Sequence, residues 1–559
     1  MGKHQSKRHG TARSNKYKAS IISALLVLAM FSTLAMAEEW DISKGDVIVN
    51  ATTNDAGETV QTVTGVVAGQ ETESTIEDSA PVITGTSGTA EAPADNTVTI
   101  TVDNGAQAEV GFTDLKITTE SNGADFNVPV VIEAGANATG SEQVTITLEG
   151  DNSVSTDHTG ISSAVDTVIQ GDGTLEVNAN LDLSSDAAYY SPVAVGIDMN
   201  GTQSPDLTIK DAASVSVNAT AVETTGSRSP GAVGIQSSMG SISVQDTAKL
   251  NASVSASSDS YDVNSLGVTG TMSVTAQDNS QLNVTASGTA TDAKGNSSTV
   301  SGITSIYVTI EDEASAGITV NSSSATDESS ANAVFGLDMT ISGDSKVDIN
   351  AESNSGGDNS TATSIQLFGE LLISDSASLT TENSATAGEG KTSTSENVVT
   401  KVTADSTATI NGTKVSKMEG DAMSSILGVE DNNITIIEKA EPAPEPEPVP
   451  EPTPETKPTT GIRPAAMSSF GTEGMVSIRY TVVEGKNAQW TLGSETGLVF
   501  ELSHEGIVRV EIDGVEVEAE IEGFFVTISA EVLDALEEGE HSIEFIYADG
   551  SASTALFVK

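Results

Sequence analysis

The chain of 559 residues contains no cysteine, and this absence removes whole classes of chemistry. No disulfide, no thiolate nucleophile and no lipidated N-terminal cysteine is possible. Histidine is nearly as rare, since only His158, His504 and His541 occur after residue 37. The sequence has no His and Cys spacing typical of a metal site, and no nucleophile paired with a usable histidine base. We therefore expect a protein that is not an enzyme.

Basic residues are also scarce. Lys and Arg number 24 against 80 Asp and Glu, and six of the 24 precede Glu38. The chain after residue 37 thus has 18 basic and 80 acidic groups, a formal charge of about −62. Nucleic acid and anionic lipid both need phosphate neutralisation by Lys and Arg, so we expect no nucleic-acid partner. The simplest role for so much negative charge is a solvated, self-repelling surface.

Long apolar runs are absent except for one near the N-terminus. Residues 3–18 carry the six basic groups, an apolar run extends from Ala19 to about Leu34, and Ala35-Met36-Ala37 is a small-x-small cleavage site. This order predicts a secretory signal peptide over residues 1–37, with a membrane anchor as the alternative. We expect no membrane span in the mature chain, and a secreted, extracellular location with association at the cell surface as a variant.

A Gly followed by an aliphatic residue recurs through the middle of the chain. The intervals between these glycines are 36, 38, 33, 35 and 34 residues. A nearly constant period predicts a stacked array in which each unit buries its apolar face against its neighbours. The glycines are Gly160, Gly196, Gly234, Gly267, Gly302 and Gly336.

Each unit contains short stretches in which apolar and polar residues alternate, such as Leu207-Thr208-Ile209 and Val215-Ser216-Val217. Alternation of this kind is typical of strands. Three strands of about three to five residues per unit predict a right-handed parallel β-helix with an aliphatic core. Polar loops such as 257–260 and 326–330 are expected on one side of it.

The fold class predicted is all-β, a right-handed parallel β-helix followed by a Pro-rich linker and a small immunoglobulin-like β-sandwich. After the signal peptide, irregular N-terminal coils and a cap span residues 38–140, and the repetitive β-helix spans 141–425. Residues 426–460 form an acidic Pro-rich linker, a stiff polyproline II spacer. Residues 461–559 form the sandwich, with a hairpin at Asp513-Gly514.

The C-terminal segment resembles the immunoglobulin-like module of cellulosomal and cell-surface proteins of anaerobic Gram-positive bacteria. The motifs that carry this resemblance lie at 480–485, 489–493, 510–514 and 539–550. The resemblance implies a non-catalytic spacer or a weak binder of surfaces and polysaccharides. The opening segment 40–47 and the coil pattern look like secreted "carbohydrate-binding domain" β-helix proteins of similar bacteria, relatives in fold of pectate lyases.

Six aspartates recur at the turn after the second strand of each unit, at intervals of 35, 32, 34, 32 and 31 residues. In stacked coils they would form a column at one corner. One interpretation is a turn residue that bonds its own backbone two residues on. The other is a ladder that binds Ca²⁺, which prefers several oxygen ligands and would relieve the repulsion of stacked carboxylates. The six are Asp211, Asp246, Asp278, Asp312, Asp344 and Asp375.

Aromatic residues make up 4% of the chain, although sugar binding usually needs aromatic platforms. Tyr189, Tyr190 and Tyr261 fall in loops expected to project from the same face, so they are the candidate ligand-binding residues. Their alternative role is to anchor those loops. Trp490 fits the core of the sandwich, and Trp40 is placed to cap the first coil.

Three functions remain open at this point. The first is a non-enzymatic, monomeric surface protein, an adhesin or glycan-binding stalk whose partner is a polysaccharide or a cell-surface glycan. The second is a lyase-like β-helix enzyme acting on acidic polysaccharide, which would need a basic residue beside the aspartates. The nearest candidates are Lys210, Lys249 and Lys346, and each looks solvent-facing. The third is a purely structural exoprotein.

Overall fold

The computed structural model describes residues 37–438 apart from 55, 122–126, 184–192, 202–203, 225–227, 292–295, 358 and 419. In the C-terminal part it describes 482–484, 488–490, 497–502, 507, 509–512, 515–517, 519–522, 525–533, 535–536, 539–546 and 551–558. The predicted signal peptide thus lies outside the described residues except for Ala37. The chain divides into two compact units, Met1–Glu445 and Pro446–Lys559, which are described separately below.

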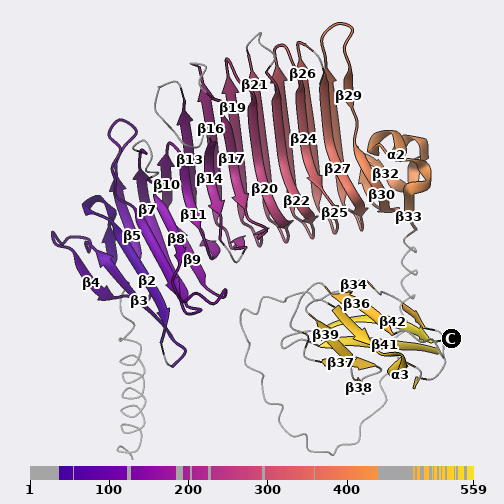
Figure 1. The fold of residues 1–559 in the computed structure, drawn as a ribbon, viewed down its shortest axis with the longest axis horizontal. Coiled ribbons are helices and arrows are strands. Elements are labelled where there is room, and N and C mark those ends of the chain that lie inside the picture. Colours follow the sequence, from indigo (N-terminus) through magenta and orange to yellow (C-terminus); the bar gives the residue numbers. More distant parts are fainter. Residues whose placement is uncertain are drawn as a thin grey trace, which may run out of the picture. The chain divides into compact units, whose positions relative to one another are not determined.

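The first unit is a parallel β-solenoid of about 10 turns, as the repeat predicts. Each strand pairs in parallel with its equivalent one coil later, so that β16 (Ser214–Glu223) lies between β13 (Thr174–Asp182) and β19 (Lys249–Ser258). Figure 1 shows these strands stacked side by side along the solenoid. Pairing between coils satisfies the backbone hydrogen-bonding groups of every internal strand.

Each coil has three faces, here named A, B and C in chain order. Face A includes β14 (Val193–Met199), β17 (Gly231–Ser237) and β24 (Ser329–Gly336), and face B includes β15 (Leu207–Ile209), β18 (Ser241–Val244) and β25 (Asp338–Ile341). Face C continues from β16 and β19 through β21 (Gln281–Ala290), β23 (Ser315–Ser324), β26 (Lys346–Ser355) and β28 (Ser378–Thr386). Three long strands serve both A and B, namely β20 (Val263–Ala276), β22 (Ser298–Ile310) and β27 (Ser360–Ile373).

The strands of faces A and C are longer than the three to five residues predicted, whereas β15, β18 and β25 of face B have the predicted length. On face C the pattern of large apolar residues stops early, but small residues such as Ala256 keep pointing inward and the strand continues to Ser258. The predicted loops 257–260 and 326–330 are therefore partly strand. Small inward residues narrow the core without ending the pairing.

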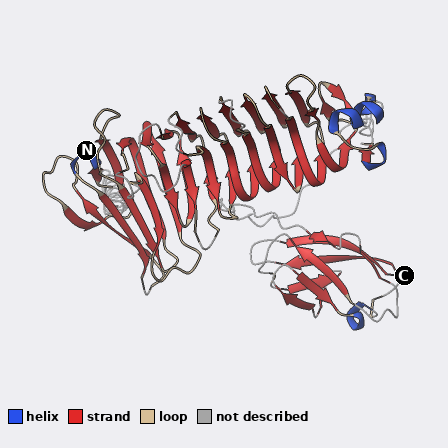
Figure 2. Cartoon of the chain, turned by 45° about the horizontal axis from the view of Figure 1, so that its top comes forward, coloured by secondary structure: helices blue, strands red, loops and turns tan. Residues whose placement is uncertain are grey.

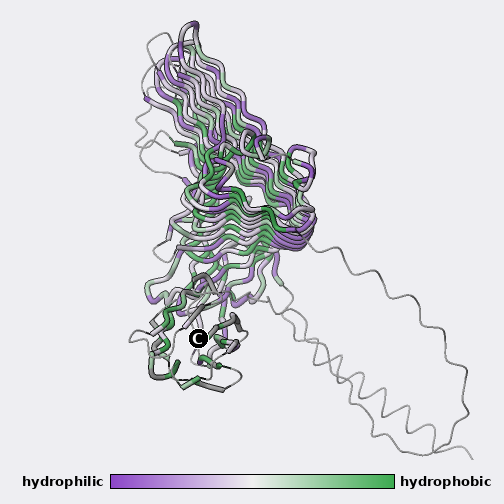
Figure 3. Tube along the Cα trace, turned by 90° about the vertical axis from the view of Figure 1, so that its right-hand side faces the viewer, coloured by the Kyte–Doolittle hydropathy of each residue, from purple (hydrophilic) through white to green (hydrophobic). Residues whose placement is uncertain are grey.

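The core is a set of ladders in which equivalent residues stack in register. One ladder contains Ile161, Ile197, Ile235, Val268, Ile303, Val334 and Ile365, all nearly fully buried. Burying each of these side chains stabilises the fold by about 1.5–3 kcal/mol. Figure 3 shows the alternation of hydrophobic and hydrophilic residues along the coils.

The repeated glycines stand directly before this ladder. A Cβ added at Gly196 would lie 2.1 Å from Val217 Cγ1 and 2.7 Å from the carbonyl oxygen of Gly234. The same contact with the next glycine's carbonyl recurs at Gly160, Gly234 and Gly267. At these four positions a side chain would clash with the backbone of the next coil, which explains why glycine recurs there.

The sixth glycine of the repeat is a correction. Val334, not Leu337, pairs with Ile303 and Ile365, so Ala333 takes the position equivalent to the glycines. Gly336-Leu337 lies three residues later, at the corner between faces A and B. The pattern predicted the wrong residue here because Gly336, like the other five glycines, precedes an aliphatic residue.

The N-terminal coils are irregular, as expected. The hairpins β2 (Val47–Thr53), β3 (Thr59–Gly65) and β4 (Ser74–Glu77) pair antiparallel beside the parallel ladder. Trp40 is fully buried in the first coil and donates its indole N–H to Asp78 Oδ2 at 3.0 Å. The remaining elements here are β1 (Glu39–Asp41), η2 (Ile42–Lys44), β5 (Val82–Ser87), β6 (Val98–Asp103), β7 (Gln107–Thr118), β8 (Val130–Ala134), β9 (Gln143–Glu149), β10 (Asp151–Thr156), β11 (Thr159–Ser163) and β12 (Asp166–Gly171).

The solenoid continues past the predicted boundary at residue 425. Its last coils contain β29 (Ser393–Ser395), β30 (Val398–Asp405), β31 (Thr409–Ile410), β32 (Thr413–Lys414), η3 (Val415–Lys417), η4 (Asp431–Asn433) and β33 (Ile434–Ile437), and β33 pairs with β30. The helix α2 (Gly420–Leu427), which the sequence analysis did not predict, buries Met423 and Leu427 against the last coil. Figure 2 shows this helical cap in blue at one end of the strands.

The second unit has two sheets around one core, formed by residues that include Trp490, Phe500 and Phe545. One sheet has the order β34 (Val482–Glu484), β36 (Leu498–Leu502), β40 (Phe525–Ile528), β39 (Ala519–Glu522). The other has the order β35 (Ala488–Trp490), β42 (Ser551–Val558), β41 (Gly539–Ile546), β37 (Arg509–Ile512), β38 (Val515–Val517), and a short helix α3 (Ala530–Leu533) lies beside them. The pairing of Ile512 with Val515 confirms the predicted hairpin.

Candidate functional site

The predicted aspartate column lies at the corner between faces B and C. Asp211, Asp246, Asp278, Asp312 and Asp375 all have φ between 56° and 62°, in the left-handed region. The same position in other coils holds Gly171 and Gly343, with φ of 102° and 71°. Gly and Asp are among the residues that tolerate this conformation, so the backbone of the turn selects them.

The carboxylates of this column bond to the backbone of the neighbouring coil. Asp246 Oδ2 accepts from the backbone N–H of Asp211 at 3.0 Å, and Asp278 Oδ2 accepts from that of Asp246 at 3.0 Å. In equivalent bonds, the carboxylates of Asp211, Asp312 and Asp375 accept from the backbone N–H groups of Gly171, Asp278 and Gly343 respectively. The sequence predicted a bond within the same turn, whereas this bond links successive coils. We name the set the aspartate ladder: Asp211, Asp246, Asp278, Asp312 and Asp375.

Asp344 does not belong to the ladder. Gly343 occupies the equivalent position, and the backbone N–H of Asp344 donates to the carbonyl oxygen of Asp312 at 2.6 Å. Across the described part of the chain, no three His, Cys, Asp or Glu side chains are grouped so that they could hold a metal ion. The calcium interpretation of the column stays a prediction.

The structure describes only one of the three candidate tyrosines. Tyr189 and Tyr190 lie outside the described residues. Tyr261 is half-buried in the loop between β19 and β20, where its backbone N–H donates to Ser258 Oγ at 2.8 Å. This bond anchors the loop onto the end of β19.

The corner between faces A and B contains a groove of about 310 Å³ that the sequence analysis missed. One register column of three residues, Thr271, Ser305 and Gly336, runs along it through consecutive coils, and Met239 and Phe368 line it in the coils before and after. The three central residues are small and buried, while Met239 and Phe368 are 47% and 60% exposed. The column therefore forms a floor closed at each end by a large apolar side chain.

Apolar side chains also form the sides of the groove. Phe335 packs edge-on against Phe368, with ring centroids 5.4 Å apart and an interplanar angle of 81°. Ile306 and Leu337 line the opposite side, and Leu337 is 39% exposed. Exposed apolar residues gathered in one hollow indicate a binding surface.

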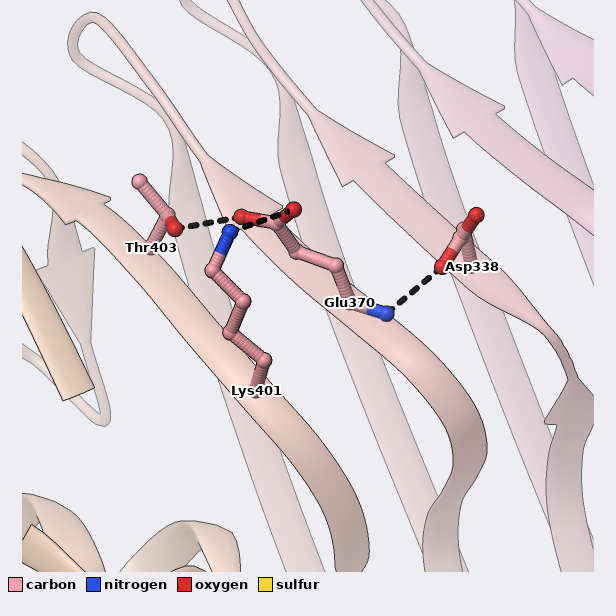
Figure 4. Close-up of polar contacts among 4 residues, drawn as sticks. All are labelled: Asp338, Glu370, Lys401 and Thr403. Atoms are coloured by element: carbon pink, nitrogen blue, oxygen red, sulfur yellow. Dashed lines mark hydrogen bonds and ion pairs between the residues drawn. The ribbon is translucent and has the colours of Figure 1, made fainter. Parts of the chain in front are cut away.

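A polar rim borders the groove on face B. Asp338 and Glu370 directly follow Leu337 and Gly369, and Glu370 Oε2 lies 3.0 Å from Lys401 Nζ (Figure 4). Asp338 Oδ1 accepts from the backbone N–H of Glu370 at 2.6 Å, and the Thr403 hydroxyl donates to Glu370 Oε1. The rim thus places carboxylates and an ammonium group beside an apolar hollow.

Three carboxylates gather at the equivalent edge of face B near the N-terminal coils. Asp166 Oδ1 accepts from the N–H of Asp206 at 2.9 Å, and Asp206 Oδ1 accepts from that of Ser241 at 2.6 Å. Burial raises the pKa of both aspartates, and for Asp166 the charges of Asp206 and Glu142 add to this. Burial also acts to raise the pKa of Glu142, but bonds from the backbone N–H groups of residues 105, 139 and 140 outweigh it and lower this pKa to about 2.

The sequence did contain a signal for the groove. Apolar residues occupy both odd and even positions in the segment Leu367-Phe368-Gly369-Glu370-Leu371-Leu372. Because side chains alternate between the two faces of a strand, some of these apolar residues must point outward. Phe335 and Leu337 are likewise out of phase with Val334. The repeat explained Gly336 as one of its glycines and gave no reason to expect an exposed apolar surface around it.

No helix among the described residues has the length and apolar character needed to cross a membrane. No protein-family model, no curated protein and no solved structure matches this chain.

Proposed function

We propose that this chain is an exported, non-enzymatic surface protein whose solenoid is a rigid stalk and whose groove binds a glycan. The observation that carries the proposal is the exposed Phe368 packed on the half-buried Phe335 beside a floor of small residues. The C–H face of a sugar ring packs on an aromatic face, whose negative quadrupole favours weakly positive hydrogens. The hydroxyl groups at the edges of the sugar would reach Asp338, Glu370 and Lys401 on the rim.

The aspartate ladder supports a role without catalysis. General acid–base chemistry needs a carboxyl group in hydrogen-bond reach of the proton it moves. Each ladder carboxylate instead accepts a backbone N–H of the preceding coil, as in the 3.0 Å bond from the Asp211 N–H to Asp246 Oδ2. A lyase would also need a base converging on these acids, and Lys249 and Lys346 are exposed on face C.

Export and display complete the proposal. The predicted signal peptide and the lack of cysteine support export of a protein stabilised by its long core. The two-sheet C-terminal unit lies where the immunoglobulin-like module was predicted, and the predicted Pro-rich segment would separate it from the stalk. The groove would then be presented at a distance from the point of attachment.

The test is glycan-array binding by the protein from residue 38 onward. We expect retained spots for the unmodified chain and a loss of signal for Phe368→Ala. Phe525→Ala is the matched control, because Phe525 is 48% exposed in the second unit. Equal binding by both variants would contradict the groove as the site, and no binding to any glycan would favour the purely structural protein.

The enzyme alternative has its own assay. Lyase action on uronic-acid polymers creates an unsaturated product with new ultraviolet absorbance. We expect no such absorbance with or without Ca²⁺. Turnover that is abolished by Asp246→Asn would replace the binding proposal by the enzymatic one.

A further inference from the structure

The floor of the groove has a defined direction and length. Thr271, Ser305 and Gly336 occupy one register column in three consecutive coils. Met239 lines the groove in the preceding coil, and Phe368 lines it in the following coil, directly after Leu367, the register partner of Gly336. Neighbouring strands are about 4.7–4.9 Å apart, so the open floor is roughly 10–15 Å long. Its long direction is the solenoid axis, across the strands.

This spacing matches an extended saccharide chain. One hexose of a β-1,4-linked chain advances by nearly the distance between two coils, and the β-1,4 linkage keeps the chain straight and its rings flat. Successive rings would therefore lie over successive coils. An α-1,4-linked glucan coils and would leave a straight floor after one or two units.

Charge selects among the β-1,4-linked chains. None of the described residues that line the groove is charged, and the rim beside it has two acids, Asp338 and Glu370, for one base, Lys401. The formal charge of the whole chain is −56. A uronic-acid chain would meet repulsion here, whereas an uncharged or amine-bearing chain would not.

Resting on the proposed function, we infer that the groove binds two or three units of a non-anionic β-1,4-linked hexose chain aligned along the solenoid axis. The rings lie over Thr271, Ser305 and Gly336. The Phe368 ring and its partner Phe335 pack against the apolar face of the terminal unit. Asp338 and Glu370 accept hydrogen bonds from hydroxyl or amino groups on the face B side.

The length of the ligand is tested by calorimetric titration with cello-oligosaccharides of increasing length. We expect affinity to rise up to three units and then to level off. Met239→Gly removes one end wall and suits a position whose φ is 73°, so the fold tolerates it. In this variant the affinity should rise further with a fourth unit, which a chain lying parallel to the strands would not show.

The charge of the ligand is tested with glucosamine oligomers and β-1,4-linked oligoglucuronates of the same lengths. At low salt the oligoglucuronates should bind at least about tenfold more weakly than the uncharged series, and added salt should reduce the difference. Phe368→Ala should weaken binding of the uncharged series about tenfold, the effect of losing one aromatic contact, while Phe525→Ala should not change it.

The outcomes separate the two proposals. Oligoglucuronates that bind as tightly as the uncharged series, a length dependence unchanged by Met239→Gly, or no binding of any of the three series would overturn this inference. In each case a Phe368-dependent spot on the glycan array would still uphold the proposed function. An array without such a spot overturns both.

Discussion

Asp246 Oδ2 lies 3.0 Å from the backbone nitrogen of Asp211, which belongs to the preceding coil. The two residues are 35 positions apart in the sequence and share one conformation, with φ of 56° and 60°. The Asp246 side chain therefore both suits the left-handed conformation of its own turn and bonds to the equivalent turn of the preceding coil.

Replacing Asp246 tests both contributions. Asp246→Ala removes the hydrogen bond to Asp211. It also places in the left-handed region an alanine, whose methyl group cannot bond to the local backbone as a carboxylate can. Together these effects should destabilise the solenoid by about 2–3 kcal/mol. Asp246→Gly loses the bond but relaxes the backbone, so its cost should be about 1 kcal/mol. Urea unfolding and hydrogen exchange of the flanking coils measure the difference.

The matched control is Asp344→Ala, because Asp344 is exposed and lies outside the ladder. We expect it to change stability by less than about 0.5 kcal/mol. Equal effects at Asp246 and Asp344 would show that the ladder adds no stability beyond that of any turn.

Gly196→Ala should be strongly destabilising. The new Cβ would lie 2.1 Å from Val217 Cγ1 and 2.7 Å from the carbonyl oxygen of Gly234, and the second of these is backbone. We expect a loss of about 3 kcal/mol or more, measured as the shift of the urea midpoint. Gly317→Ala is the control, since its Cβ would meet only the end of the Asn283 side chain, at 2.9 Å.

Ile209→Asp tests the inward direction of the core ladders. Ile209 is fully buried between Ile169 and Val244 of the adjacent coils. An unpaired carboxylate there should destabilise the solenoid by more than about 4 kcal/mol. Thr208→Asp, on the outer side of the same strand, should change stability by less than about 1 kcal/mol. A melting curve of Ile209→Asp that matches the unmodified chain would be incompatible with this packing.

The buried carboxylates predict a specific pH dependence. The pKa values of Asp166 and Asp206 are raised above 3.8, so the folded state binds their protons more tightly than the unfolded state does. Their stabilising contribution is complete below pH 3.8 and disappears as the pH rises through the folded values. Asp206→Asn keeps an acceptor for Ser241 without the charge, so it should stabilise these coils at pH 7 and flatten the pH profile.

Glu142 should act in the opposite direction. Its pKa is lowered to about 2 from 4.5, so its contribution is present above pH 4.5 and is lost as the pH falls through about 2. Hydrogen exchange of β9 and β12 between pH 2 and 7 follows both groups. A monotonic profile unaffected by Asp206→Asn and Glu142→Gln would contradict these assignments.

The sequence predicted the solenoid because its physical cause is repeated in every coil. Ile197, Ile235 and Ile303 recur where the core needs an aliphatic side chain, and Gly196, Gly234 and Gly302 recur where the backbone excludes one. The hydrogen bonds of the ladder could not be predicted in the same way, because Asp suits a left-handed turn whether its carboxylate reaches its own coil or the next.

The groove escaped prediction for a different reason. Phe335, Leu337 and Phe368 each appear once, and they come together only because the coils stack in register. The end of the solenoid was also missed, since α2 is a single short amphipathic helix with no counterpart in the repeats. Features that occur in one coil have no period to reveal them.

The aspartate ladder has a consequence for how this protein could change its length. The backbone N–H groups of Asp211, Asp246 and Asp278 are satisfied by the next winding, so removal of everything from just after Asp246 through Asp278 would leave Asp246 joined to Asn279 with the acceptor of the following winding, Asp312, still in place. The solenoid is thus divisible wherever the following winding supplies a ladder carboxylate. The length of the solenoid can therefore be shortened or extended by whole windings, while the sequences of its two ends stay the same.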